Sequence, residues 1–136
     1  MRGPVVPDCP ELTARVDVLV DGPGALVVAN FQTSRRPWGP AKRAEAAPLL
    51  LLTGELARVY SGGKPVHLAV AILTTSQRPR LVVHRLPLDP ERVTQAKIMA
   101  GQVCRAIQAG NIYPSPSAIQ CPSCPYRAKP CQAWPG

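Results

Sequence analysis

Residues 14–34 read ARVDVLVDGPGALVVANFQTS, and this stretch decides the fold. Residues 14–20 alternate and are rich in Val, a pattern that is typical of a β-strand. The Asp-Gly-Pro-Gly run at 21–24 is a strong turn signal. Residues 25–31 have the composition of a returning strand. The sequence therefore predicts an antiparallel hairpin near the start of the chain.

The chain after this hairpin alternates between helical and strand patterns. A helical pattern covers residues 41–60 and ends at a Gly-Gly pair, which is typical of a helix C-terminus. Pro48 is expected to separate its first turns from a firmer helix over 49–60. Residues 66–74 and 80–86 predict two more strands.

A second helix is predicted to begin at Asp89-Pro90-Glu91, with Asp89 as the cap and proline at the first helical position. Gly110 is expected to end it. Its apolar residues follow the spacing of one buried helical face: Val93, Ala96, Ala100, Val103 and Ile107. The order of elements predicts an α/β (α+β) fold, with a small mixed sheet and flanking helices.

Composition limits the class of protein. The chain has 136 residues, 46% of them hydrophobic, which fits one small domain with a core. The net charge of +8 favours a polyanionic partner, although an arginine-rich protein without such a partner has the same charge. The sequence shows no membrane span and no signal peptide, so no membrane contact and a cytoplasmic location are expected.

Five cysteines are present, and three of them stand close together near the end of the chain. Cys121, Cys124 and Cys131 lie in a Pro- and Cys-rich tail, from residue 111 onward, for which no regular element is expected. Cys9 and Cys104 lie far apart from one another. In a reducing compartment, such a cluster indicates metal binding before it indicates disulfides.

The hairpin, the Leu-rich helix and the tail motif Cys-x2-Cys-Pro-Tyr together resemble one family. They are similar to the RecB/AddB-like PD-(D/E)XK nucleases, including the CRISPR-associated exonucleases, in a degenerate and N-terminally truncated form. The resemblance implies a restriction-endonuclease-like PD-(D/E)XK core over residues 11–118. Residues 1–10 would be a lead-in, and residues 119–136 a Cys-rich tail that binds a metal or a cluster.

The same resemblance places the catalytic positions at Asp17, Asn30 and Gln32. The family has an acid at the first position and Asp-x-Lys at the other two, so only Asp17 is retained. Residues two apart on a strand project from the same face. The neutral Asn30 would hold Mg²⁺ or Mn²⁺ weakly, and Gln32 cannot supply the charge of lysine. Leu49 and Thr53 replace a Gln and a Tyr of the family.

These departures predict a catalytically impaired nuclease-like domain that binds DNA or serves a structural role in recombination and repair. One alternative is an active metal-dependent DNA exonuclease, with relocated groups drawn from Lys42, Glu45, Asp8 or Glu11. Another is a non-functional fragment of a longer nuclease. Asp17 can also be an ordinary strand-end acid. Isolated histidines such as His84 are expected to be structural.

A basic loop follows the second predicted strand. The resemblance implies that this region faces DNA, and the candidate contacts are Arg35, Arg36, Trp38, Lys42 and Arg43. Arginine suits phosphate, and an exposed tryptophan can stack on an unpaired base. The alternative is a solvated loop with Trp38 packed against the helix. The resemblance also implies a helicase–nuclease partner protein.

For the tail, the resemblance implies a 4Fe-4S cluster, with Zn²⁺ as the alternative. Its ligands would be Cys121, Cys124 and Cys131, with Cys9 as the fourth. Three reduced thiols without a metal are the other interpretation. Cys104 is expected to be a small structural thiol in the second helix.

Overall fold

The computed structural model describes residues 1–111, 121–127 and 131. The chain divides into two compact units, Met1–Cys104 and Arg105–Gly136, and each is described by itself. The first unit contains all the strands of the described residues: β1 Arg2–Gly3, β2 Leu12–Thr13, β3 Val18–Asp21, β4 Leu26–Ser34, β5 Val66–Thr74 and β6 Leu81–Leu86. Its helices are α1, Pro40–Arg58, and the greater part of α2, Pro90–Gln108.

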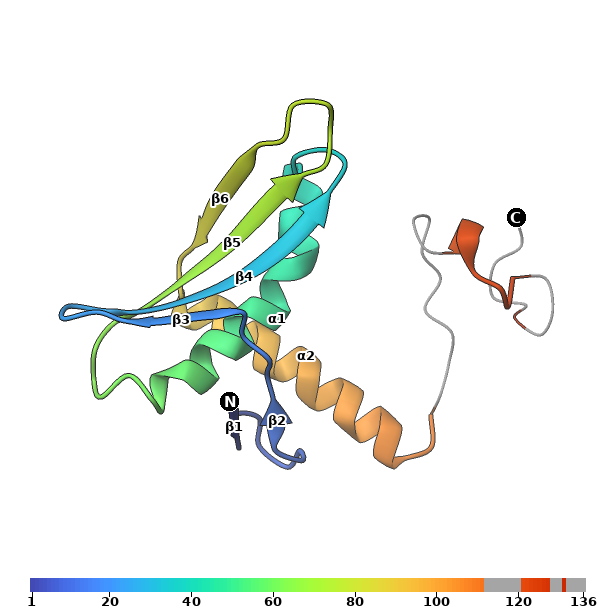
Figure 1. Cartoon of the computed structure of the whole chain (residues 1–136). Coiled ribbons are helices and arrows are strands. Elements are labelled where there is room, and N and C mark those ends of the chain that lie inside the picture. The colour runs from blue at the N-terminus through green and yellow to red at the C-terminus, as the bar shows by residue number, and fades with distance from the viewer. Residues whose placement is uncertain (112–120, 128–130, 132–136) are drawn as a thin grey trace. The chain divides into compact units, whose positions relative to one another are not determined.

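The main sheet has four strands in the order β3-β4-β5-β6 (Figure 1). β3 and β4 form the predicted antiparallel hairpin, with Val18 opposite Ala29. β4 and β5 are parallel, and α1 forms the crossover between them. β5 and β6 are again antiparallel. The predicted fold class, α+β with a small mixed sheet, is confirmed.

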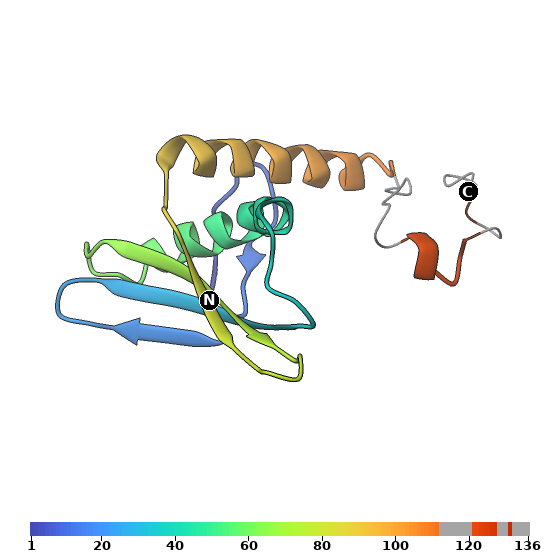
Figure 2. The ribbon, with the colours of Figure 1, turned by 90° about the horizontal axis from the view of Figure 1, so that it is seen from above.

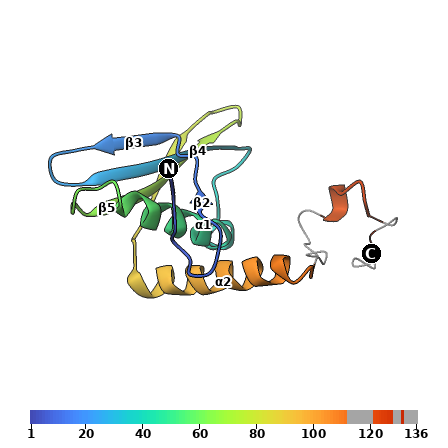
Figure 3. The ribbon, with the colours of Figure 1, turned by 90° about the horizontal axis from the view of Figure 1, so that it is seen from below.

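The core lies on one side of this sheet. Both helices lie on that side, as the views from above and from below show (Figures 2 and 3). The buried cluster takes residues from β4, β5, α1 and α2: Leu26, Val28, Leu51, Ala57, Val66, Leu68, Val93 and Ala96. Burial of each large apolar side chain contributes roughly 1.5–3 kcal/mol to folding, so this cluster fixes the helices on the sheet.

Gly54 marks the point where α1 comes closest to the sheet. A Cβ atom at this position would lie 2.9 Å from both Cδ atoms of Leu68 in β5. It would also lie 2.9 Å from Cδ1 of Leu88. These distances are shorter than real Cβ contacts, so the packing of helix on sheet depends on the absence of a side chain here.

The opposite face of the sheet is apolar and carries no helix of the described residues. Five large side chains from the four strands are between 43% and 59% exposed there: Val20, Phe31, Leu73, Leu81 and Val83. In β4 and β5 this face alternates with the buried side chains of the core, as the pleat requires. None of the described helices is long and apolar enough to cross a lipid bilayer.

The expected break at Pro48 is wrong, since α1 runs without interruption from Pro40 to Arg58. Proline at position 48 removes the N–H that would bond the Ala44 carbonyl. Ala44 is exposed, so water can reach this carbonyl. The helix continues because its later residues, such as Leu50 and Leu51, are buried against the sheet.

α2 confirms the predicted cap but not the predicted face. The Asp89 carboxylate accepts a hydrogen bond of 2.9 Å from the Glu91 N–H. Val93 and Ala96 are buried, yet Val103 and Ile107 are 56% and 64% exposed, so the prediction of one buried face is wrong beyond the first turns. The core cluster takes only Val93 and Ala96 from this helix.

Two short segments differ from what was expected. The segment expected to be a lead-in forms β1, which pairs with β2, and Val6 beside it is buried. The terminal ammonium of Met1 donates to the Ala14 carbonyl at 2.9 Å. In the tail, Cys121–Ser123 forms a short 3-10 helix, so the expectation of no regular element there is wrong.

Candidate nucleic-acid interface

Asp17 lies just before β3 and closes the hairpin ladder. Its Oδ2 accepts a hydrogen bond of 2.8 Å from the Phe31 N–H. The register that pairs Val18 with Ala29 puts Asn30 opposite Asp17 in the next step. The structure therefore brings Asp17 and Asn30 together, with one carboxylate oxygen already bonded to the backbone.

Asn30 and Gln32 share one face of β4, as expected, but they differ in environment. They alternate with Phe31 and follow the buried Val28, so they lie on the side that carries the helices. Gln32 is exposed, whereas Asn30 Oδ1 is buried and has no hydrogen-bond partner among the described residues. This edge offers one carboxylate and one amide, which supply a single negative charge for a divalent cation.

The two α1 positions where the resemblance predicts a Gln and a Tyr carry an apolar residue, Leu49, and a threonine, Thr53, whose hydroxyl is already hydrogen-bonded. Leu49 is 71% exposed. Thr53 is buried, and its hydroxyl donates to the Leu49 carbonyl at 2.8 Å. This bond satisfies the hydroxyl within α1, as is usual for a threonine in a helix.

Two of the groups considered as replacements have other contacts. Glu11 forms an ion pair of 2.6 Å with Arg2. The Lys42 ammonium lies 4.8 Å from the centroid of the Trp38 ring, a cation–π contact. Glu45 is exposed on α1. A relocated catalytic group stays a prediction.

The basic residues gather where β4 and β5 end. Arg35 and Arg36 follow β4 directly. Arg78 and Arg80 lie in the turn between β5 and β6, at the same end of the sheet (Figure 1). The Thr75 N–H donates to the Ser34 carbonyl at 2.9 Å, which ties this turn to the end of β4.

Thr74 fixes the shape of that turn. Its backbone N–H donates to the Arg80 carbonyl and its hydroxyl accepts from the Arg80 N–H, each at 2.9 Å. The Ser76 hydroxyl donates to the Arg78 carbonyl at 2.9 Å. With the two cations of the first turns of α1, this end of the sheet collects six: Arg35, Arg36, Lys42, Arg43, Arg78 and Arg80. We call this set the basic end.

The opposite end of the sheet binds its cations to acids. Lys64 lies 2.5 Å from Asp21 at the β3–β4 turn, and it also donates to the Gly22 carbonyl. Lys97 and Arg58 contact Glu55 at 2.7 and 3.2 Å. These five residues form the paired end: Asp21, Glu55, Arg58, Lys64 and Lys97.

The charge state of Glu55 reflects these contacts. Burial raises the pKa of this carboxyl, but hydrogen bonds from Lys97 and Arg58 outweigh it and hold the pKa below its ordinary value. No ion pair found among the described residues includes a cation of the basic end. The two ends therefore differ in how their cations are used.

Trp38 connects the basic end to the core. It packs against the buried group of Leu50, Val70 and Ile72. Its Nε1 is buried without a hydrogen-bond partner in the described part of the chain. With Lys42 over one face, the ring is held between α1 and the sheet, which matches the packed alternative considered from the sequence.

Sequence reasoning missed Arg78 and Arg80. Arg78 lies in a turn that looked like an ordinary polar connection, and Arg80 was expected to begin the next strand, which starts at Leu81. The signal was available in the predicted order of elements, because parallel strands joined by a helix end at the same edge of a sheet. The turn after β5 must therefore lie beside the basic loop after β4.

The tail is described only in part. Cys121 and Cys124 share one turn, in which the Cys124 N–H donates to the Cys121 carbonyl at 3.2 Å. The Cys131 N–H donates to the Tyr126 carbonyl at 3.0 Å. Among the described residues, no group of three His, Cys, Asp or Glu side chains lies close enough together to hold a metal ion. The cluster or zinc site stays a prediction.

Comparison of the chain with family models, with curated proteins and with solved structures gave no match.

Proposed function

We propose that this chain binds nucleic acid through the basic end, as a domain of the PD-(D/E)XK type that does not cleave efficiently. One observation carries the proposal. Six cations from three connected segments lie at one end of the sheet, and none of them is in an ion pair of the described residues. A row of unpaired arginines is the usual means of binding a phosphate backbone.

The residues at the three expected catalytic positions, Asp17, Asn30 and Gln32, support binding without efficient cleavage. Metal-assisted phosphodiester hydrolysis needs several anionic oxygens to hold the ion beside the phosphate. Here Asp17 already accepts a backbone hydrogen bond, and the neutral Asn30 stands opposite. The exposed Gln32 lacks the ammonium that would stabilise developing charge. A role in recombination or repair, with a helicase–nuclease partner, extends the same proposal.

Salt-dependent binding tests this function. Anisotropy of labelled single- and double-stranded oligonucleotides would be measured with the full chain over a range of salt. Arg35→Gln with Arg36→Gln removes two phosphate contacts, so the log–log slope should fall by about 1.8 on duplex and about 1.4 on single strands.

The matched control is Arg2→Gln with Arg58→Gln, which removes the same charge away from the basic end. Its slope should stay close to that of the parent. Equal slopes for the parent and the Arg35/Arg36 variant would place the binding face elsewhere.

For the tail, we propose that Cys121, Cys124 and Cys131 bind iron as a 4Fe-4S cluster, or Zn²⁺, with Cys9 as the fourth ligand. The support is the motif in the sequence and the common turn of the first two thiols. Metal analysis of anaerobically purified protein should find iron or zinc, and Cys121→Ser should lower it. If the parent protein contains neither iron nor zinc, this part of the proposal is refuted.

A further inference from the structure

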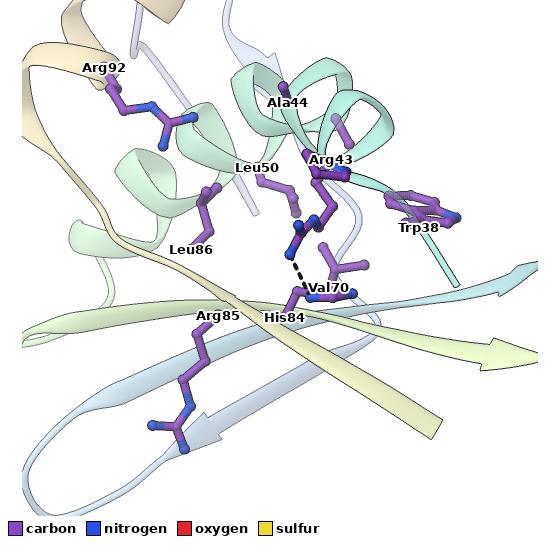
Figure 4. Close-up of a pocket in the computed structure, with 11 residues that line it drawn as sticks. Trp38, Arg43, Ala44, Leu50, Val70, His84, Arg85, Leu86 and Arg92 are labelled. Atoms are coloured by element: carbon purple, nitrogen blue, oxygen red, sulfur yellow. Dashed lines mark hydrogen bonds between the residues drawn. The ribbon is translucent and has the colours of Figure 1, made fainter. Parts of the chain in front are cut away.

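A pocket of about 280 Å³ lies between the first half of α1 and strands β5 and β6 (Figure 4). Its apolar lining includes Leu50 of α1, Val70 of β5 and Leu86 of β6. All of its lining residues belong to the first unit of the chain. Its volume is near the lower limit of small-molecule sites, which start at about 300 Å³.

The polar side chains of this pocket are basic. Arg43 comes from α1 and Arg92 from α2, and no carboxylate is among the lining residues. Neither arginine is in an ion pair of the described part of the chain. Arg85 also borders the pocket, but its side chain points away from it in Figure 4. An anionic group is the natural complement of this lining.

His84 positions the Arg43 side chain at the pocket. An Arg43 nitrogen lies 3.1 Å from its Nδ1. Arginine can only donate, so Nδ1 accepts and the proton of the neutral ring is on Nε2. That Nε2 and the Nε1 of Trp38, which also lines the pocket, are buried donors without an acceptor in the described residues. Protein atoms cover both groups, so the side chains left to meet an anionic ligand are the arginines of the pocket.

We propose that this pocket binds a nucleoside monophosphate, as a free nucleotide or as a nucleotide of a single strand. The phosphate is held between Arg43 and Arg92, because the guanidinium fork matches phosphate oxygens. The flat ring system lies against Leu50, Val70 and Leu86. The inference goes beyond the proposed function, because this pocket takes up one whole nucleotide, although it shares Arg43 with the basic end.

Calorimetric titration of the full chain tests the ligand class. The probes are adenosine 5′-monophosphate, adenosine and inorganic phosphate, at low ionic strength. Adenosine 5′-monophosphate should bind, and the two partial probes should bind at least about tenfold more weakly, because each satisfies only one part of the pocket. Absence of binding by adenosine 5′-monophosphate, or equal binding by inorganic phosphate, would overturn the proposal.

Two arginine variants test the location. Arg92→Gln should weaken adenosine 5′-monophosphate binding by about tenfold or more, as expected for a lost charge-assisted contact. Arg85→Gln removes the same charge from a side chain that points away, and it should change binding less than about twofold. Arg92 is partly exposed, so circular dichroism should show both variants folded. An equal loss in both variants would contradict the assignment.

Oligonucleotide binding separates this inference from the proposed function. If a single-stranded oligonucleotide displaces adenosine 5′-monophosphate, the pocket takes a nucleotide of a strand; if both bind together, it takes the free form. Binding of the mononucleotide without any oligonucleotide binding would refute the proposed function alone. Salt-dependent oligonucleotide binding without mononucleotide binding would refute the pocket alone.

Discussion

The two ends of the sheet carry cations in opposite circumstances. At the paired end, Lys64 meets Asp21 and Lys97 meets Glu55. At the basic end, the described residues give Arg35, Arg36 and their neighbours no such acid. The difference shows that the net charge of the chain is not spread evenly over its surface. Cations of one end are in ion pairs with acids, and cations of the other end are in none of the ion pairs of the described residues.

The comparison also explains why composition was a weak guide. A net charge of +8 is compatible with an arginine-rich surface of any kind. Local arrangement decides between the alternatives, because paired charges cancel over a short distance while grouped like charges create a field that attracts polyanions. The six cations of the basic end are such a group.

The largest effect on stability is expected at the paired end. Glu55→Gln removes two charge-assisted contacts, with Lys97 and Arg58, from a carboxylate whose side chain is 19% exposed. The free energy of unfolding should fall by about 1–2 kcal/mol in urea titration. Glu45→Gln, on an exposed part of the same helix, is the matched control and should change it by less than about 0.5 kcal/mol. Equal effects would remove the contrast between the ends.

The same carboxylate gives that end a pH dependence. Burial raises the pKa of Glu55, but the hydrogen bonds from Lys97 and Arg58 leave it lower than in the unfolded chain. Its contribution to stability is therefore complete above the unfolded pKa and is lost as pH falls through the folded pKa. Between about pH 6 and about pH 3, the parent should lose more stability than Glu55→Gln. If the free energy of unfolding falls equally with pH in the parent and in Glu55→Gln, this prediction is wrong.

A second way to sharpen the comparison is to place an acid toward the basic end. Asn30→Asp with Gln32→Lys restores the acid and the ammonium that the resemblance predicts beside Asp17. Without metal, the two opposed carboxylates should repel and lower the melting temperature. Mn²⁺ should reverse this, with an affinity about tenfold above that of the parent for about 1.4 kcal/mol of added attraction.

Asn30→Gln with Gln32→Lys is the control for this variant, because it adds the ammonium without the acid. Calorimetric titration with Mn²⁺ would compare all three proteins. Equal affinity in the parent and the acidic variant, both folded, would mean that Asp17 and residues 30 and 32 do not form one site. The resemblance to the nuclease family would then fail at its central point.

The smallest effect on stability is expected at the basic end. Arg35→Gln with Arg36→Gln removes no ion pair of the described residues and relieves repulsion between neighbouring charges. The free energy of unfolding should change by less than about 0.5 kcal/mol. Loss of oligonucleotide binding with unchanged stability is the combination that the proposed function requires. A clear loss of stability would show that these arginines belong to the fold.

Local signals were enough to predict most of the sheet. The turn at 21–24 and the flanking Val-rich runs specify the β3–β4 hairpin, and β5 has the predicted bounds, 66–74. The break predicted at Pro48 was wrong, because burial of the residues after it stabilises the helix more than the proline destabilises it. The periodicity of α2 identified a face but not how far along the helix the core extends. β1 and β2 are too short to have a pattern of their own.

The site was less predictable because it is assembled from distant segments. Arg43, His84 and Arg92 come from α1, β6 and α2, and nothing in their own neighbourhoods shows that they share a pocket. The basic loop after β4 was found because its cations are adjacent in sequence. Arg78 and Arg80 could be assigned to the same end of the sheet only once the parallel pairing of β4 and β5 was known.

Gly54 gives this fold a spacer that has no side chain. Leu50 lies one helical turn before it on α1, so the two face the sheet together. A Cβ at position 54 would meet methyl groups of Leu68 and Leu88 at 2.9 Å, so these side chains or the helix would have to shift. A shift of the helix would move Leu50 with it and change the depth of the pocket. The dimensions of the pocket thus depend on a residue that contributes no atom to its wall, which a survey of lining residues would overlook.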